Sequence, residues 1–416
     1  MSRLIINGGN RICGEVRIGG AKNSVLPILA ATVLNGGINI IHDTPKLLDV
    51  YIMERILTSL GCSVKRENRT VIVDSGQLTN YEIPEELVRE MRSSVIFLGA
   101  MLSRCGKIRA SYPGGCEIGS RPIDLHLKSL REMGADIKEE HGFLNCKAEK
   151  LRGCDIQLDF PSVGATENIM LAAVFAEGVT TIRNAAKEPE IIDLEKFLNA
   201  AGAKIQGAGT ATVHIEGVER LYNVGHDIIP DRIVAGTYLA AALITKGEII
   251  LKNIIHEHLQ PILYKFRECG CTIEAYDHSL RLVAPGEIKA IESIKTLPHP
   301  GYPTDMQAQM MAVLSLGNGT TIFTENIFEN RYKHANELMR MGANIKIDGR
   351  TAVVRGIEKL SGATVIAQDL RGGAALVLAG LAAEGTTIVE NVRHIDRGYE
   401  NIHDVLSGLG ADIIRQ

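Results

Sequence analysis

The chain of 416 residues contains no tryptophan, and aromatic residues make up only 4% of it. Its formal net charge at pH 7 is −4. Proteins that bind nucleic acid without sequence preference combine a cationic surface with aromatic side chains on which bases stack. This composition provides neither a broad cationic surface nor many aromatic side chains. We therefore expect small-molecule ligands and no nucleic acid, and an anionic ligand would have to meet a local cluster of cations.

Long apolar runs are also missing. The longest, such as residues 374–383, fall well short of the roughly 18 residues that indicate a membrane span, and the opening MSRLIINGG lacks the apolar core of a signal peptide. The eight cysteines lack the paired spacing of metal ligands and are typical of reduced thiols. The sequence predicts a cytoplasmic protein without membrane association, and a monomer is favoured.

Motifs for common cofactors do not occur either. No Gly-x-Gly-x-x-Gly follows a predicted strand, and no Walker lysine loop is found. His256 and His258 are two positions apart on a predicted helix, so they point to different faces and do not form a metal-binding pair. We expect neither a metal nor an organic cofactor.

The chain contains instead six copies of a unit of about 70 residues. One glycine of each copy lies in a turn such as LGCSV or MGADI, and another lies 23 to 28 residues before it. The turn glycines are Gly61, Gly134, Gly202, Gly270, Gly342 and Gly410, and the upstream glycines are Gly37, Gly106, Gly178, Gly247, Gly319 and Gly385. Because the length favours two domains, we expect three units in each.

Every unit begins with a helix that is apolar nearly all round, as in VLPILAATVL, and continues with a strand, a polar loop, an amphipathic helix and two further strands. The apolar helix is predicted to be buried and the amphipathic one to be solvated. The pattern indicates a mixed α/β fold in which sheets surround buried helices.

The sixth unit stops at Gln416 without its last strands. Residues 6–18, INGGNRICGEVRI, resemble the corresponding stretch of the fifth unit, VRGIEKLSGATVI at residues 354–366. The sequence therefore predicts an N-terminal domain of residues 21–229 and a C-terminal domain of residues 1–20 plus 230–416.

Polar residues that are not shared by all units are candidates for function. One set lies where each buried helix is predicted to begin, and helix starts attract phosphate and carboxylate groups. Helix capping and surface charge are the alternative explanation for any one of them. The set comprises Lys22, Arg92, Ser162, Arg232, Asp305 and Arg371.

A second set lies in the loop after the strand and comprises Cys116, Arg121, Arg331 and Arg397. Arginine binds carboxylate and phosphate through two parallel hydrogen bonds, so a ligand with several acidic groups is indicated. Cys62, Cys269 and Cys271 occupy positions that are small and apolar in other units, whereas Cys116 follows two glycines in a loop able to bend. Functional and structural explanations of Cys116 remain open at this point.

The chain resembles the enolpyruvyl transferase family from end to end, in the branch that acts on UDP-N-acetylglucosamine. The resemblance rests on GGAKNSVLPILAA (19–31), MRSSVIFLGAML (91–102), PGGCEIGSRPIDLHL (113–127), SVGATENIM (162–170), PHPGYPTDMQAQ (298–309), IFENRYKHANEL (327–338), DLRGGAALVLAG (369–380) and HIDRGYE (394–400). It implies two inside-out α/β barrel domains of three units each, with the active site in the cleft between them.

The resemblance implies a transfer of the enolpyruvyl group of phosphoenolpyruvate to the 3-hydroxyl of UDP-N-acetylglucosamine, the first committed step of peptidoglycan synthesis. It places Cys116, Asp305, Lys22 and Arg397 in catalysis, and Cys116 as the target of fosfomycin. The residues implied for phosphoenolpyruvate are Lys22, Asn23, Arg121, Arg371 and Arg397. Those implied for UDP-N-acetylglucosamine are Arg92, Arg121, Pro122, Ile123, Asp124, Leu125, Ser162, Val163, Gly164, Asp305 and Ile327.

One position departs from the pattern, because Phe160 stands where family members carry lysine two residues before the serine. A contact at this position is therefore not carried over. Two alternatives remain beside the main interpretation: transfer of the same group to shikimate 3-phosphate, and a catalytically silent paralogue that binds the nucleotide sugar. The PGGC loop and IGSRPIDLH favour the nucleotide-sugar branch.

Overall fold

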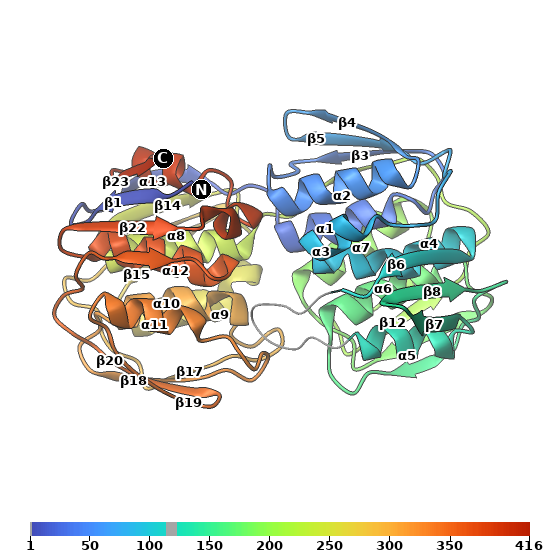
Figure 1. Ribbon diagram of the computed structural model, residues 1–416. Helices are drawn as coiled ribbons and strands as arrows, with labels where there is room; N and C mark the ends of the chain where they lie inside the picture. Colours follow the sequence, from blue (N-terminus) through green and yellow to red (C-terminus); the bar gives the residue numbers. More distant parts are fainter. Residues whose placement is uncertain (1, 114–122) are drawn as a thin grey trace. The chain divides into compact units, whose positions relative to one another are not determined.

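The computed structural model describes residues 2–113 and 123–416, and their backbone contacts divide them into two compact units. The first comprises residues 2–19 and 230–416, and the second residues 20–113 and 123–229. Figure 1 shows both, coloured along the sequence. The predicted mixed α/β class is confirmed, with helices in the core of each unit and sheets around them.

The second unit contains three sheets. In each of them most neighbouring strands are antiparallel. The orders are β13 (Val224–Asp227), β3 (Ile38–His42), β5 (Thr70–Asp74), β4 (Ser63–Glu67); β6 (Lys107–Ser111), β8 (Phe143–Lys147), β7 (Asp136–Glu140); and β11 (Lys204–Gln206), β12 (Thr212–Glu216), β10 (Val179–Arg183), β9 (Asp155–Gln157).

The first unit repeats this plan with three sheets of four strands. Two of them include a strand from the N-terminal residues. The orders are β21 (Thr364–Ile366), β22 (Thr386–Glu390), β1 (Leu4–Asn7), β23 (Asp412–Arg415); β15 (Thr272–Tyr276), β16 (Ser279–Val283), β14 (Glu248–Lys252), β2 (Cys13–Arg17); and β17 (Ser293–Lys295), β18 (Thr320–Thr324), β20 (Thr351–Arg355), β19 (Asn344–Asp348).

The helices that the sequence marks as apolar all round form the cores. In the second unit these are α1 (Lys22–Ala31), α4 (Phe97–Cys105) and α6 (Val163–Ala173), and α4 packs directly on α6. In the first unit they are α8 (Arg232–Ile244), α10 (Gln307–Leu314) and α12 (Leu370–Ala382), which contact one another. Their buried surface is continuous because Ala and Gly allow close approach of the helices.

The amphipathic helices lie beside these cores and bury one face each. They are α2 (Leu48–Ser59), α5 (Asp124–Glu132), α7 (Pro189–Ala200), α9 (His256–Glu268), α11 (Lys333–Arg340) and α13 (Ile402–Gly408). A short helix, α3 (Glu85–Glu90), and three 3-10 turns, η1 (Arg92–Ile96), η2 (Thr304–Met306) and η3 (Val392–Arg397), complete the described elements. None of the helices among these residues is both long and apolar enough to span a bilayer.

The two ends of the chain meet in one sheet. Strand β1 is antiparallel to β22 and to β23, and Leu4 pairs with Val389 on one side and Arg415 on the other. Figure 1 shows N and C beside each other at this sheet. Strand β1 lies between β22 and β23. In the sheet of the third repeat, β12 has the equivalent position between β10 and β11.

Deletion of residues 1–20 should therefore lower the stability of the first unit. Without β1, the strands β22 and β23 lose the partner that lies between them. Without β2, β14 loses its parallel neighbour, and backbone N–H and C=O groups are left unpaired in both sheets. Chemical denaturation should show an earlier transition for the deleted protein. Moving the same residues behind Gln416 through a short linker should restore it, because Leu4 already faces Arg415; equal stability of the deleted and complete chains would contradict the assignment.

Candidate functional site

The six polar residues expected at helix starts lie there. Lys22 and Arg232 are the first residues of α1 and α8, Arg92 opens η1 and Ser162 caps α6. Asp305 lies in η2, which leads into α10, and Arg371 is the second residue of α12. Each side chain is thus placed by the first turn of a core helix, where backbone N–H groups are free to face a ligand.

Lys22 is buried with its ammonium group in an ion pair, 2.6 Å from Oδ2 of Asp49. Asp49 lies in the first turn of α2 and is fully buried. The carboxylate fixes the position of the ammonium group and offsets part of the cost of burying its charge. Asn23 follows on the same turn of α1 and is half-buried. Asp49 was missing from the predicted site, because its α2 position is indistinguishable from a helix-start acid in the sequence.

Asp305 has the most specific surroundings of the predicted residues. Nη2 of Arg331 donates to its Oδ1 at 2.9 Å, and Nη2 of Arg371 donates to its Oδ2 at 3.1 Å. Both arginine side chains are nearly inaccessible, whereas that of Asp305 is 26% exposed. Two guanidinium groups thus fix the orientation of the Asp305 carboxylate through charge-assisted hydrogen bonds, and part of this side chain stays accessible to solvent.

The guanidinium group of Arg371 lies over the ring of Tyr399, with its carbon 5.4 Å from the ring centroid. Burial by itself lowers the pKa of Arg371, whereas Tyr399 and Asp305 raise it, and the net shift is upward. The hydroxyl of Tyr399 bonds to Oγ1 of Thr237 and accepts from Nε2 of Gln309. Arg371 is therefore a fixed cation. Arg331, an unmatched loop residue in the sequence, was not assigned to a substrate, although its loop position equals that of Arg397.

Arg397 and Ile327 lie in the same unit. Arg397 is the last residue of η3 and is half-buried, and it has polar interactions of its own. Ile327 lies after β18, where its backbone N–H donates to Oε1 of Glu325 at 2.9 Å. Together with Asp305 and Arg371, four of the predicted residues are therefore held in this unit on the ends of core helices or of strands.

The second unit brings together three segments assigned to the nucleotide sugar: η1 with Arg92, the start of α5 with Asp124, and the cap of α6 at Ser162. Val163 and Gly164 form the first turn of α6, and Ser162 accepts from the N–H of Ala165 at 3.3 Å. Ile123 is buried, Leu125 is half-buried and Asp124 is exposed. Cys116, Arg121 and Pro122 lie outside the described residues.

One buried amide, Asn168 in α6, joins these segments. Its Oδ1 accepts from the N–H of Gly99, and its Nδ2 donates to the carbonyl oxygen of Val95, so its orientation is fixed. The same Nδ2 donates to Nδ1 of His126 at 3.0 Å, which places the proton of the neutral imidazole on Nε2. A Cβ on Gly164 would lie 3.3 Å from this Nε2, so the ring packs against the first turn of α6.

The environment of His126 predicts a stability change with pH. Burial and then the charge of Arg92 lower its pKa from 6.5 to about 4. Between these values the unfolded chain binds a proton that the folded chain does not, so stability falls as pH falls from 6.5 to 4, by on the order of 3 kcal/mol at most. Denaturation of His126→Gln at several pH values should show a flatter slope, while the exposed His278→Gln should not; equal slopes would contradict the assignment.

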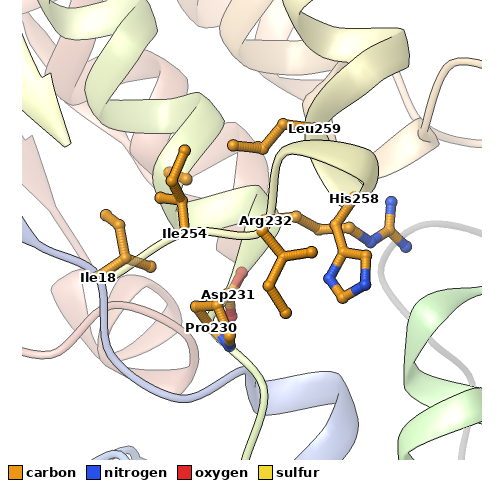
Figure 2. Close-up of a pocket in the computed structure, with 9 residues that line it drawn as sticks. Ile18, Pro230, Asp231, Arg232, Ile254, His258 and Leu259 are labelled. Carbon is orange, nitrogen blue, oxygen red and sulfur yellow. The ribbon is translucent and has the colours of Figure 1, made fainter. Parts of the chain in front are cut away.

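A shallow hollow lies in the first unit at the start of α8 (Figure 2). Asp231 caps this helix by accepting from the N–H groups of Ile233 and Val234 at 2.8 and 2.9 Å. The walls are otherwise mainly apolar and include Ile18, Ile254 and Leu259, as Figure 2 shows. Its lining does not include the residues assigned to either substrate. Within the described ranges, no three His, Cys, Asp or Glu side chains gather as metal ligands.

Comparisons with known proteins agree with this architecture. A crystal structure of the enolpyruvyl transferase NikO from Streptomyces tendae superposes with a TM-score of 0.90 at 26% identity, covering 100% of this chain and 99% of that one. An EPSP synthase from Acinetobacter baumannii shares the fold with a TM-score of 0.76 at 17% identity.

Full-length relatives are much closer in sequence. The UDP-N-acetylglucosamine 1-carboxyvinyltransferase 2 of Caldanaerobacter subterraneus subsp. tengcongensis is 54% identical over 415 residues, with 100% of both chains covered. The protein of the same name from Clostridium tetani is 52% identical, again over the whole of both chains. The model of the family described as EPSP synthase (3-phosphoshikimate 1-carboxyvinyltransferase) matches residues 6–406. The chain therefore belongs to the EPSP synthase family of carboxyvinyl transferases.

Proposed function

We propose that this chain transfers the enolpyruvyl group of phosphoenolpyruvate to the 3-hydroxyl of UDP-N-acetylglucosamine and releases phosphate. The observation that carries the proposal is the 54% identity, over the full length of both chains, with a protein named UDP-N-acetylglucosamine 1-carboxyvinyltransferase 2. The product would enter peptidoglycan synthesis in the cytoplasm.

The site residues fit an addition followed by an elimination. The sugar hydroxyl oxygen attacks C2 of phosphoenolpyruvate while C3 takes up a proton, and loss of a C3 proton with departure of phosphate then yields the enol ether. Asp305 receives the hydroxyl proton or orients the hydroxyl, since Arg331 and Arg371 fix the orientation of its carboxylate and its side chain is partly exposed. Cys116 donates the proton to C3.

The cations stabilise charge throughout this reaction. Lys22, Arg121, Arg371 and Arg397, with Asn23, would bind the carboxylate and phosphate of phosphoenolpyruvate. Lys22 is already fixed by Asp49, and Arg371 by Asp305 and Tyr399, so little reorganisation is needed when the negative charge of the intermediate develops.

The nucleotide sugar would contact the segments around Asn168 and the turn at Ile327. Arg92, Arg121 and the first turn of α6 supply donors for the diphosphate, and that turn also supplies the positive end of a helix dipole. The residues proposed for this substrate are Arg92, Arg121, Pro122, Ile123, Asp124, Leu125, Ser162, Val163, Gly164, Asp305 and Ile327.

Phosphate release tests the proposal. Phosphoenolpyruvate with UDP-N-acetylglucosamine should release phosphate, whereas shikimate 3-phosphate, the acceptor suggested by the description of the family model, should not replace the nucleotide sugar. Release with shikimate 3-phosphate alone would favour the sister activity. Binding of the nucleotide sugar without any release would indicate a silent paralogue.

A further inference from the structure

One acidic residue breaks the pattern of the repeat and is not part of the proposed substrate contacts. The position lies six residues after each upstream glycine, directly after a strand. In four repeats it carries Asp or Asn in the left-handed region, namely Asp43, Asn184, Asn253 and Asn391, with φ between 51° and 61°. The second repeat has Tyr112 and the fifth has Glu325, and neither has positive φ.

The asparagines at this position have a structural task. The Nδ2 group of each donates to the carbonyl oxygen of the residue that follows the neighbouring parallel strand. The pairs are Asn184 with Leu158 at 2.9 Å, Asn253 with Ile18 at 2.7 Å, and Asn391 with Ala367 at 3.2 Å. In the fifth repeat the same contact is made one residue later, by Asn326 with Thr296 at 3.1 Å. Glu325 is therefore not needed for this task.

Glu325 is instead the centre of a buried cluster. Its side chain is 1% exposed, and its two oxygens accept four hydrogen bonds. Oε1 accepts from Oγ1 of Thr296 at 2.9 Å and from the N–H groups of Ile327 and Phe328 at 2.9 and 3.1 Å. Oε2 accepts from Oγ1 of Thr304 at 2.9 Å. These bonds offset the cost of burying the carboxylate, which an apolar residue would not incur.

The two oxygens hold two different parts of the proposed site. The Oε2 bond fixes Thr304, the residue before Asp305 in η2. The Oε1 bonds fix the turn of Ile327 and Phe328. The contacts form a closed ring, because the guanidinium group of Arg331 lies 5.4 Å from the ring of Phe328 and also donates to Asp305.

We propose that Glu325 is a positioning residue that sets Asp305 through one oxygen and the nucleotide-sugar turn at Ile327 through the other. Its kinetic consequences, for turnover and for substrate affinity, rest on the proposed function. The proposal predicts that weakening the contacts of Oε2 and weakening those of Oε1 have different kinetic effects.

Thr304→Val removes the hydroxyl that donates to Oε2 of Glu325 and preserves the shape of the side chain. Turnover should fall about tenfold, the factor expected for one lost hydrogen bond to a charged group, while calorimetric affinity for UDP-N-acetylglucosamine stays within about twofold. Thr296→Val removes one of the three hydrogen bonds to Oε1, and with it the hydroxyl that accepts from the N–H of Asn326 at 2.9 Å beside the Ile327 turn. The affinity for UDP-N-acetylglucosamine should therefore fall about tenfold while turnover at saturation changes little.

A matched control is available on the strand that leads to Glu325. Thr321 is buried in β18, and its hydroxyl has no hydrogen-bond partner within the described part of the chain. Thr321→Val should leave both quantities unchanged. Glu325→Gln should retain most activity. Its amide oxygen can accept from Thr296, Ile327 and Phe328, while its amide nitrogen donates to the hydroxyl oxygen of Thr304. Glu325→Ala should lower both turnover and affinity for the nucleotide sugar.

The decisive test combines Thr304→Val with Asp305→Asn. If Thr304 acts through Asp305, it should have no further effect on turnover once the carboxylate is gone, and the unfolding free energies of the two variants should be non-additive. Full additivity in both measurements, or identical kinetic patterns for Thr304→Val and Thr296→Val, would overturn the proposal. The unfolding cycle needs no activity, so it distinguishes a wrong position for Glu325 from a wrong proposed function.

Discussion

Asp305→Asn should lower turnover by about 10²–10⁴ while leaving the affinity for UDP-N-acetylglucosamine largely intact. The amide cannot accept a proton at neutral pH. In addition, an NH₂ group replaces one of the two carboxylate oxygens. This hydrogen-bond donor must then face Arg331 or Arg371, each of which donates to an oxygen in the unsubstituted protein. Steady-state kinetics with calorimetry of the nucleotide sugar separate the two quantities.

A surface pair serves as the control for this substitution. Asp155 forms an ion pair with Arg183 at 2.7 Å, but both side chains are more than half exposed. Asp155→Asn should therefore change neither turnover nor stability appreciably. Unchanged turnover in Asp305→Asn would remove its role in proton transfer, and a loss confined to KM would mean that Asp305 only positions the sugar.

Fosfomycin should inactivate the protein completely by alkylating Cys116 and no other cysteine. The thiolate would open the epoxide, forming a carbon–sulfur bond and leaving a hydroxyl, while the phosphonate takes the place of the phosphate beside Lys22. Other thiols are disfavoured because burial raises the pKa of Cys62, Cys146, Cys269 and Cys271 to about 12. UDP-N-acetylglucosamine should accelerate the labelling.

Peptide mass mapping identifies the labelled residue, and the exposed Cys13 provides an internal control for non-specific alkylation. Cys116→Asp should escape inactivation and keep activity, since a carboxylic acid with a raised pKa can still donate a proton. A label on another cysteine, or lost activity without a label, would contradict the assignment. A folded but inactive Cys116→Asp would mean that the thiol does more than donate a proton.

The repeat made most of the fold predictable. Glycines at fixed spacing mark the ends of helices and strands, and the stretches VLPILAATVL and AALVLAGLAA form the buried helices α1 and α12. A helix that is apolar on every side has no polar face to turn toward water, so it is buried in the core. The order of strands within each sheet was less accessible, because it depends on pairings between distant segments such as β1 and β22.

The partners of the site residues were harder to predict. Comparison of repeats placed Asp305 and Lys22 among the polar residues at helix starts, but the residues that hold them lie elsewhere in the chain. Asp49 looks like an ordinary acid in a first helical turn, and Arg371 reaches Asp305 across 66 positions. Glu325 was visible in principle, since the same position carries Asn in three other repeats.

The most direct measurement is the identity of the product formed in deuterated water. Phosphoenolpyruvate and UDP-N-acetylglucosamine should yield an enolpyruvyl ether at the sugar 3-oxygen with one phosphate per product. Deuterium should enter its vinyl CH₂ group, because C3 gains a proton from solvent-exchanged donors before losing one. Mass spectrometry and NMR resolve both features. Pyruvate as the sole organic product, with the nucleotide sugar unchanged, would contradict the account.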